Sequence, residues 1–238
     1  MVVHVLERAL AAPCVSRAVV ATDDRRIFEA VRAAGYEALM TSPTHASGSD
    51  RLAEAAEHIE ADIVVNVQGD EPLIAPATIE RAVGALLADE TAAMATTCEP
   101  IESAADVLSG DVVKVVVDAD GHALYFSRSP VPFPRDAVRR HGSLAAALEV
   151  EPELSAVFRK HTGLYVYRRA FLLEYARWPQ TTLERVESLE QLRVLERGHR
   201  ILVVEAAAPS VGVDTEEDLR RVRELFERIP DFKLKAQS

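Results

Sequence analysis

Short apolar runs alternate with helix-like segments along most of the chain, and this alternation restricts the possible folds more than any other feature. The pattern predicts strands over residues 16–24, 36–42, 61–67, 92–101 and 199–206. Helices are predicted between them, over residues 2–12, 25–35, 51–59, 76–89 and 181–198, with a last helix after Thr215. Strands separated by helices indicate an α/β fold, a doubly wound and mostly parallel sheet with right-handed crossovers.

One segment departs from this alternation. Residues 111–134 contain two runs of alternating polarity joined by Asp-Ala-Asp-Gly, which is typical of an antiparallel hairpin. The following segment, residues 130–152, is rich in proline and charge and is predicted to be a surface excursion. The length of 238 residues suits one large domain over 1–238 with the hairpin as a small insertion.

Charge and cysteine content exclude several classes of protein. The net charge of −11 argues against a nucleic-acid binder and against a protein that lies on anionic membranes. The longest apolar runs are strand-sized, so no membrane span is expected. Cys14 and Cys98 are the only cysteines and lie far apart in the sequence, which favours a reducing, cytoplasmic location over a disulfide framework.

Polar residues gather where predicted strands end. The β-branched run Ile63–Val67 suits a strand covered on both faces, and Gln68, Gly69, Asp70 and Glu71 follow it at once. A polar turn would explain this composition, but ligands of parallel α/β sheets bind beyond the carboxyl ends of the strands. Asp214, just before the last helix, could converge with Asp70, and such a carboxylate pair suits Mg²⁺ bound to substrate phosphates.

A second candidate site is the Gly/Ser loop that opens the helix near residue 50. Ser47 and Gly48 precede a helix N-terminus, whose free N–H groups and positive dipole end suit an anion. An ordinary N-cap at Ser49 or Asp50 explains the loop equally well.

Further candidates have an ordinary structural alternative each. Arg128 ends the second hairpin strand, and its planar fork suits a carboxylate or phosphate, although surface arginines are common there. His161 and Tyr165 are compatible with core positions. Glu190 and Gln191 border an expected buried stripe of Leu183, Val186, Leu189 and Leu192, where a solvated face is the usual outcome.

Taken together, these segments resemble a known family. The ordered motifs are HASGSDRLAEA, VVNVQGDEPLI, KVVVDADGHALYFSRSPVPFPRD, KHTGLYVYRRAFL, LERVESLEQLRVLE and VGVDTEEDLRRV. They resemble the motifs of the 3-deoxy-manno-octulosonate cytidylyltransferases (CMP-Kdo synthetases) and run from about Val2 to the last helix. The combination also separates this chain from the related sialic-acid cytidylyltransferases.

The resemblance implies a nucleotide-diphospho-sugar transferase-like fold, an activity and a set of site residues. The implied enzyme is a cytoplasmic homodimer that transfers CMP from CTP to the sugar acid Kdo, releasing pyrophosphate, for lipopolysaccharide synthesis. Its dimerisation subregion would lie at about residues 111–165, around the hairpin. Asp70 and Asp214 match the Mg²⁺ ligands, which makes them the catalytic pair; Gln68, Arg128, His161, Tyr165, Glu190 and Gln191 fall on sugar-site motifs; Ser47, Gly48 and Arg51 fall on the cytidine loop, and Asp70 also contacts the nucleotide.

One family feature has no counterpart in this sequence. The family opens with a strand and a P-A-R…L-P-G-K loop that grips the triphosphate, and this chain begins within the family's first helix. The alternative function is therefore an N-terminally truncated homologue, weak or inactive in catalysis, that only binds sugar or nucleotide or dimerises. The missing strand would lie between Ala18–Ala21 and Ile63–Val67, so those two strands are expected not to hydrogen-bond to each other.

A third interpretation, a glycosyltransferase with an Asp-x-Asp metal motif, would use Asp118–Asp120. That triplet is predicted to form the hairpin turn, which makes this interpretation weaker.

Overall fold

The computed structural model describes residues 1–45, 47–210, 212–213 and 215–228. Its internal contacts divide the chain into two compact units, one formed by residues 1–43, 67–80 and the chain from 207 onward, the other by residues 44–66 and 81–206. Helix α4 (Pro76–Ala88) begins in the first unit and continues into the second. The single domain with a dimerisation subregion at about residues 111–165 stays a prediction.

The first unit contains a small parallel sheet and its helices. Its elements are α1 (Val2–Leu10), β1 (Val19–Thr22), α2 (Arg25–Ala33), β2 (Glu37–Met40) and α11 (Glu216–Arg228). Strands β1 and β2 pair in parallel, with Val19 opposite Glu37. Local signals fix the two ends of α2. The Asp24 carboxylate accepts the Arg26 N–H at 2.7 Å, and the helix stops before Gly35, whose φ of +84° favours glycine.

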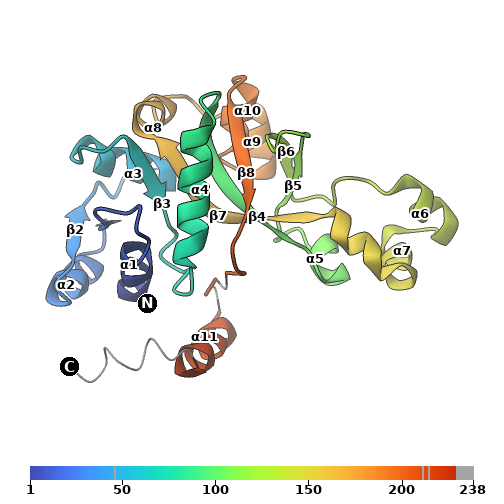
Figure 1. Ribbon diagram of the computed structural model, residues 1–238, viewed down its shortest axis with the longest axis horizontal. Coiled ribbons are helices and arrows are strands. Elements are labelled where there is room, and N and C mark those ends of the chain that lie inside the picture. Colours follow the sequence, from blue (N-terminus) through green and yellow to red (C-terminus); the bar gives the residue numbers. More distant parts are fainter. Residues whose placement is uncertain (46, 211, 214, 229–238) are drawn as a thin grey trace. The chain divides into compact units, whose positions relative to one another are not determined.

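The second unit is built on a six-stranded sheet (Figure 1). Its strands are β3 (Ile63–Asn66), β4 (Ala92–Pro100), β5 (Lys114–Val117), β6 (Ala123–Ser127), β7 (Arg159–Arg168) and β8 (Arg200–Glu205). The order is β6-β5-β7-β4-β8, with β3 also paired to β7. Met94, Phe126, Leu172, Leu192 and Ile201 are among the buried side chains of its main core.

The α/β class is confirmed, and the strand directions are more mixed than the hairpin alone would make them. Strand β7 is antiparallel to β3, β4 and β5, whereas β4 and β8 are parallel. Four strands (β3, β4, β5 and β8) therefore run one way, and β6 and β7 run the other way. Strand β7 follows the hairpin in the chain and lies between β3 and β4, antiparallel to both. Antiparallel pairing therefore extends to the middle of the sheet.

Strands β1 and β3 do not hydrogen-bond to each other, as expected. Strand β1 pairs with β2, and β3 pairs with β7. The prediction that β3 is covered on both faces is wrong, since all four of its residues are only half-buried. Among the described strands β7 is its single neighbour, so β3 has the burial of an edge strand.

The predicted surface excursion at residues 130–152 contains two short helices instead. Helices α6 (Arg135–His141) and α7 (Leu144–Val150) lie together at one end of the second unit, near α5 (Ala104–Leu108) (Figure 1). A 3₁₀ turn at Pro152–Val157 leads from α7 into β7. Leu148 of α7 packs with Ile101, Val107 and Phe158 in a second, smaller core, and this burial outweighs the polar composition of the segment.

The helix predicted over residues 181–198 is broken in the middle. It consists of α9 (Thr182–Glu187) and α10 (Leu192–Glu196), separated at Ser188, whose φ is +54°. The predicted stripe is therefore wrong in its first half: Leu183 is 36% exposed and Val186 76% exposed, whereas Leu189 and Leu192 are buried. The Thr181 N–H donates to the Glu184 carboxylate at 3.1 Å, which is one half of a capping box.

A buried ion pair holds the two short helices together. The Arg193 Nε donates to the Glu184 carboxylate at 2.7 Å, and both side chains are only 3% exposed. Arg193 also donates to the Trp178 carbonyl at 3.1 Å, just beyond α8 (Arg169–Tyr175). The pair thus ties both segments around the break to the rest of the second unit.

Among the described residues, no helix has the length and apolar character to cross a membrane.

We expect Arg193→Met to lower the free energy of unfolding by about 3–5 kcal/mol, because Glu184 would be left buried without its cation. Chemical denaturation measures the change, and Arg177→Met, at an exposed arginine, should stay within about 0.5 kcal/mol of the wild type. The double variant Glu184→Gln/Arg193→Met should lose less than the single one. Equal stability of Arg193→Met and Arg177→Met would contradict a structural role for the pair.

Candidate active site

Tyr165 and Gln191, two predicted sugar-site residues, are in direct contact in the second unit. The Tyr165 hydroxyl on β7 donates to the Gln191 Oε1 at 3.1 Å. Gln191 is 3% exposed, so the solvated face expected for this position is wrong. Its Nε2 is buried and has no hydrogen-bond partner in the described part of the chain. A buried amide that is oriented by its oxygen and leaves its N–H donors unused is a candidate ligand-binding group.

Glu190 connects this pair to the loop that opens α3 (Gly48–Glu57). The Ser49 hydroxyl donates to the Glu190 carboxylate, and the Tyr175 hydroxyl donates to the Glu190 carbonyl at 3.0 Å. Burial raises the pKa of Tyr165 and of Tyr175, so both phenols stay protonated near neutral pH and act as donors. The structure therefore brings the predicted sugar-site residues at 190–191 close to the predicted cytidine loop.

His161 lies beside Tyr165, with ring centroids 5.4 Å apart. The Thr96 hydroxyl lies 2.8 Å from the Leu164 carbonyl and 2.9 Å from the His161 Nε2. Its single hydrogen goes to the carbonyl, which can only accept, so Thr96 accepts the Nε2–H of a neutral ring. Burial lowers the pKa of His161 to about 3. The ring is therefore uncharged near neutral pH, and its Nδ1 is left as an acceptor.

Arg128 is held mainly by backbone carbonyls. Its Nε donates to the Glu187 carbonyl at 2.8 Å and its Nη1 to the Gly110 carbonyl at 3.1 Å. The Glu187 carboxylate in turn accepts the Arg128 backbone N–H at 2.9 Å and the Ser127 hydroxyl at 2.7 Å. The guanidinium has five N–H donors, so this arrangement fixes its plane and leaves donors for an anionic group.

The start of α3 has the geometry expected of an anion site and of a capped helix alike. The Ser47 hydroxyl accepts the Asp50 N–H at 3.2 Å, as an N-cap does. A Cβ added at Gly48 would meet nothing within 4 Å, so the packing of this chain does not itself require glycine there. Arg51 lies in the first turn of the same helix.

The remaining predicted residues belong to the first unit. Gln68 and Asp70 lie in the segment after β3, where the Asp70 carbonyl accepts the Val213 N–H at 2.9 Å. The Asp70 Oδ1 is buried and has no hydrogen-bond partner among the described residues. Asp214, the predicted second carboxylate, lies outside the described residues.

Several contacts of these groups were missed from the sequence. Ser49, Thr96 and Tyr175 hold Glu190 and His161, and Glu187 positions Arg128. One signal was available for Glu187: Tyr125 and Ser127 are two residues apart on β6 and so share a face, and the hydroxyls of both donate to the Glu187 carboxylate, at 3.4 and 2.7 Å. Nothing in the sequence indicates which residue that partner is.

Similarity to known proteins over most of the chain shows its family. A cytidylyltransferase family model matches residues 1–201. A 3-deoxy-manno-octulosonate cytidylyltransferase from Geobacter metallireducens is 54% identical over 228 residues, covering 96% of this chain and 88% of the relative. The chain belongs to the 3-deoxy-manno-octulosonate cytidylyltransferase family. This confirms the resemblance stated from the motifs and the class of enzyme it implied.

A second relative and two solved structures are also similar to this chain. The one from Geobacter sulfurreducens is 52% identical and covers 94% of this chain, with 88% of its own length matched. The structure of CMP:2-keto-3-deoxy-manno-octonic acid synthetase in complex with CTP has a TM-score of 0.83 at 42% identity, over 95% of this chain and 87% of its own. A nucleotidyl transferase from Methanothermobacter, 17% identical with a TM-score of 0.56 over 95% of this chain and 80% of its own, shares the fold.

We expect the half-buried His161 to make the folded chain less stable as the pH falls. The ring stays neutral in the folded state down to about pH 3, whereas an unfolded histidine takes up a proton near pH 6.5. The unfolded state then binds more protons, so the free energy of unfolding decreases between these two values. Between pH 7.5 and 5, the wild type should lose about 2 kcal/mol more than His161→Gln.

Denaturant titrations at the two pH values measure this difference. His58→Gln, at an exposed histidine of the same unit, is the matched control and should follow the wild type. Parallel pH dependences for the wild type and His161→Gln would show that His161 is not held neutral.

Proposed function

We propose that this chain transfers CMP from CTP to Kdo, releasing pyrophosphate. Its family and its 54% identity to a 3-deoxy-manno-octulosonate cytidylyltransferase support this reaction over the non-catalytic alternative. The single structural observation that carries the proposal is the buried Gln191 amide. Its oxygen accepts a hydrogen bond from Tyr165, and its Nε2 has no partner among the described residues. This is expected of a donor that binds a sugar hydroxyl.

The other residues of the second unit have complementary roles in this proposal. The neutral His161 accepts a hydrogen bond from a sugar hydroxyl through Nδ1, and Arg128 pairs with the sugar carboxylate through its remaining donors. Ser47, Gly48 and Arg51, at the start of α3, bind the cytidine nucleotide. Glu190 orients the helix start through Ser49. Gln68 is assigned to the sugar through the resemblance of its motif alone.

We also propose Mg²⁺ as the cofactor, with Asp70 and Asp214 as its ligands. The donor chemistry of Asp70 fits, because its buried Oδ1 is a hard oxygen atom without a partner in the described chain. When bound, the ion would neutralise charge on the triphosphate, which phosphoryl transfer requires more than covalent help. Asp214 enters through the resemblance of its motif alone.

The cellular setting is proposed on the same basis. A CMP-Kdo-forming enzyme would serve lipopolysaccharide synthesis in the cytoplasm, where CTP is available. The homodimer is proposed from the family resemblance, with residues 111–165 as its interface.

The direct test supplies CTP, Kdo and Mg²⁺ to the purified chain and follows pyrophosphate release and CMP-Kdo formation. We expect both products with Kdo and neither with sialic acid.

Gln191→Ala should lower kcat/KM for Kdo by about 10-fold or more, since a hydrogen bond between uncharged groups contributes roughly 0.5–1.5 kcal/mol and an unpaired Tyr165 adds to the loss. Gln180→Ala, at an exposed glutamine, is the control. Failure of the wild type to form CMP-Kdo would refute the proposed reaction.

The magnesium proposal has its own test. Asp70→Asn keeps the shape of the side chain and removes its charge, so we expect a folded protein whose turnover falls at least 100-fold and needs more Mg²⁺ for half-maximal rate. Asp62→Asn, at an exposed aspartate before β3, should keep the wild-type Mg²⁺ dependence. An unchanged Mg²⁺ dependence in Asp70→Asn would remove Asp70 from the metal site.

A further inference from the structure

Several hydrogen bonds fix the turn of the hairpin that β5 and β6 form. The Asp118 Oδ1 accepts the backbone N–H of Asp120 at 2.9 Å and that of His122 at 2.8 Å. Gly121 has a φ of +87°, and its carbonyl accepts the Val203 N–H of β8 at 2.9 Å. The turn is thus held both internally and against the neighbouring strand, so the side chains that it carries have defined positions.

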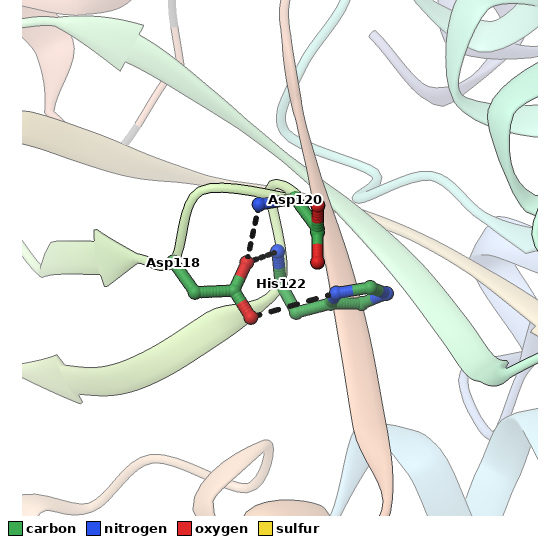
Figure 2. A group of neighbouring side chains, drawn as sticks. All are labelled: Asp118, Asp120 and His122. Carbon is green, nitrogen blue, oxygen red and sulfur yellow. Dashed lines mark hydrogen bonds and ion pairs between the residues drawn. The ribbon is translucent and has the colours of Figure 1, made fainter.

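Three of these side chains face a common point (Figure 2). Asp118, Asp120 and His122, here called the hairpin-tip cluster, each offer one ligand atom, and these atoms all lie within 4.8 Å of one another. The Asp118 Oδ2 lies 3.6 Å from the His122 Nδ1 (Figure 2). Carboxylates near one another are common on surfaces, so this proximity alone is not evidence of a site.

The second observation is the state of the histidine. His122 is only 7% exposed, and its Nε2 lies 2.6 Å from the Asp89 Oδ2. An ionised carboxylate can only accept, so Nε2 carries a hydrogen and Nδ1 is the ring atom available to a ligand. That Nδ1 is buried and has no hydrogen-bond partner in the described part of the chain. A buried ring nitrogen without a hydrogen-bond partner, beside two carboxylates, has the arrangement of a metal ligand.

We propose that the hairpin-tip cluster binds a divalent transition-metal ion of the zinc type. The His122 Nδ1 and one carboxylate oxygen each from Asp118 and Asp120 are the protein ligands, and water completes the coordination. Asp89 is a positioning residue, because a carboxylate on the far nitrogen fixes the orientation of a ligating imidazole and raises its basicity.

The distances support an ion of this type. Ligands about 2.1 Å from a tetrahedral zinc ion lie roughly 3.4 Å apart, close to the 3.6 Å between Nδ1 and Oδ2. The same 3.6 Å is too long for a hydrogen bond, so Asp118 does not occupy the Nδ1 atom. The nitrogen ligand favours zinc over Mg²⁺ and Ca²⁺, which prefer oxygen donors alone.

This site is separate from the proposed magnesium site in its residues and in its unit. Asp118, Asp120, His122 and Asp89 all belong to the second unit, whereas Asp70 belongs to the first. Its ligands differ from every residue assigned to CTP, Kdo or Mg²⁺ above. Zinc binding at the hairpin tip can therefore be measured without catalysis.

Calorimetric titration of the purified chain with ZnCl₂, in millimolar MgCl₂, tests the proposal. Asp120 is exposed, and its side chain makes no hydrogen bond among those of the described residues, so Asp120→Asn should fold normally. We expect the wild type and the control Asp106→Asn to bind one more zinc ion than Asp120→Asn does. Asp89→Asn keeps the Oδ1 that Thr91 uses but cannot accept from Nε2, and should bind zinc about 10- to 100-fold more weakly.

Two results would overturn the proposal. The first is a wild-type chain that binds no zinc, which would leave His122 as a structural bridge between carboxylates. The second is equal zinc stoichiometry in the wild type and Asp120→Asn, which would place any bound ion elsewhere. Melting curves of the variants in the absence of zinc confirm that each is folded.

Discussion

Strand β7 is the element on which the second unit depends. Its ten residues pair with β4 along one edge, and along the other edge with β5 near the start and with β3 near the end. Backbone groups that are satisfied on both edges hold the strand firmly in the sheet. His161 and Tyr165 lie on this strand, so their positions relative to Thr96 on β4 are set by the sheet register.

The break at Ser188 provides the other half of the same arrangement. In a continuous helix, the side chains of residues 190 and 191 would point in different directions. The left-handed backbone at Ser188 breaks the helix and brings the Gln191 side chain inward to Tyr165. The buried Glu184–Arg193 pair bridges the break, and the Arg128 guanidinium donates to the Glu187 carbonyl at the end of α9. A sheet strand and a broken helix thus converge on one polar cluster inside a largely apolar core.

The sequence predicted what local chemistry decides and missed what distant contacts decide. The turn at Asp118–Gly121 and the end of the helix near Gly35 were predicted, because each depends on a few neighbouring residues. The central position of β7, the burial of Leu148 and the break at Ser188 depend on partners far along the chain. The site residues came from the resemblance, and their contacts, such as Ser49 with Glu190, join residues 141 positions apart.

A crystal structure of this chain with bound Kdo tests most directly the claim that a prearranged polar cluster on β7 and at the N-cap of α10 receives the sugar. We expect a Kdo oxygen within about 3.2 Å of the Gln191 Nε2, while the Tyr165–Gln191 hydrogen bond is retained. Kdo bound away from this cluster, with the Gln191 Nε2 still without a partner, would contradict it.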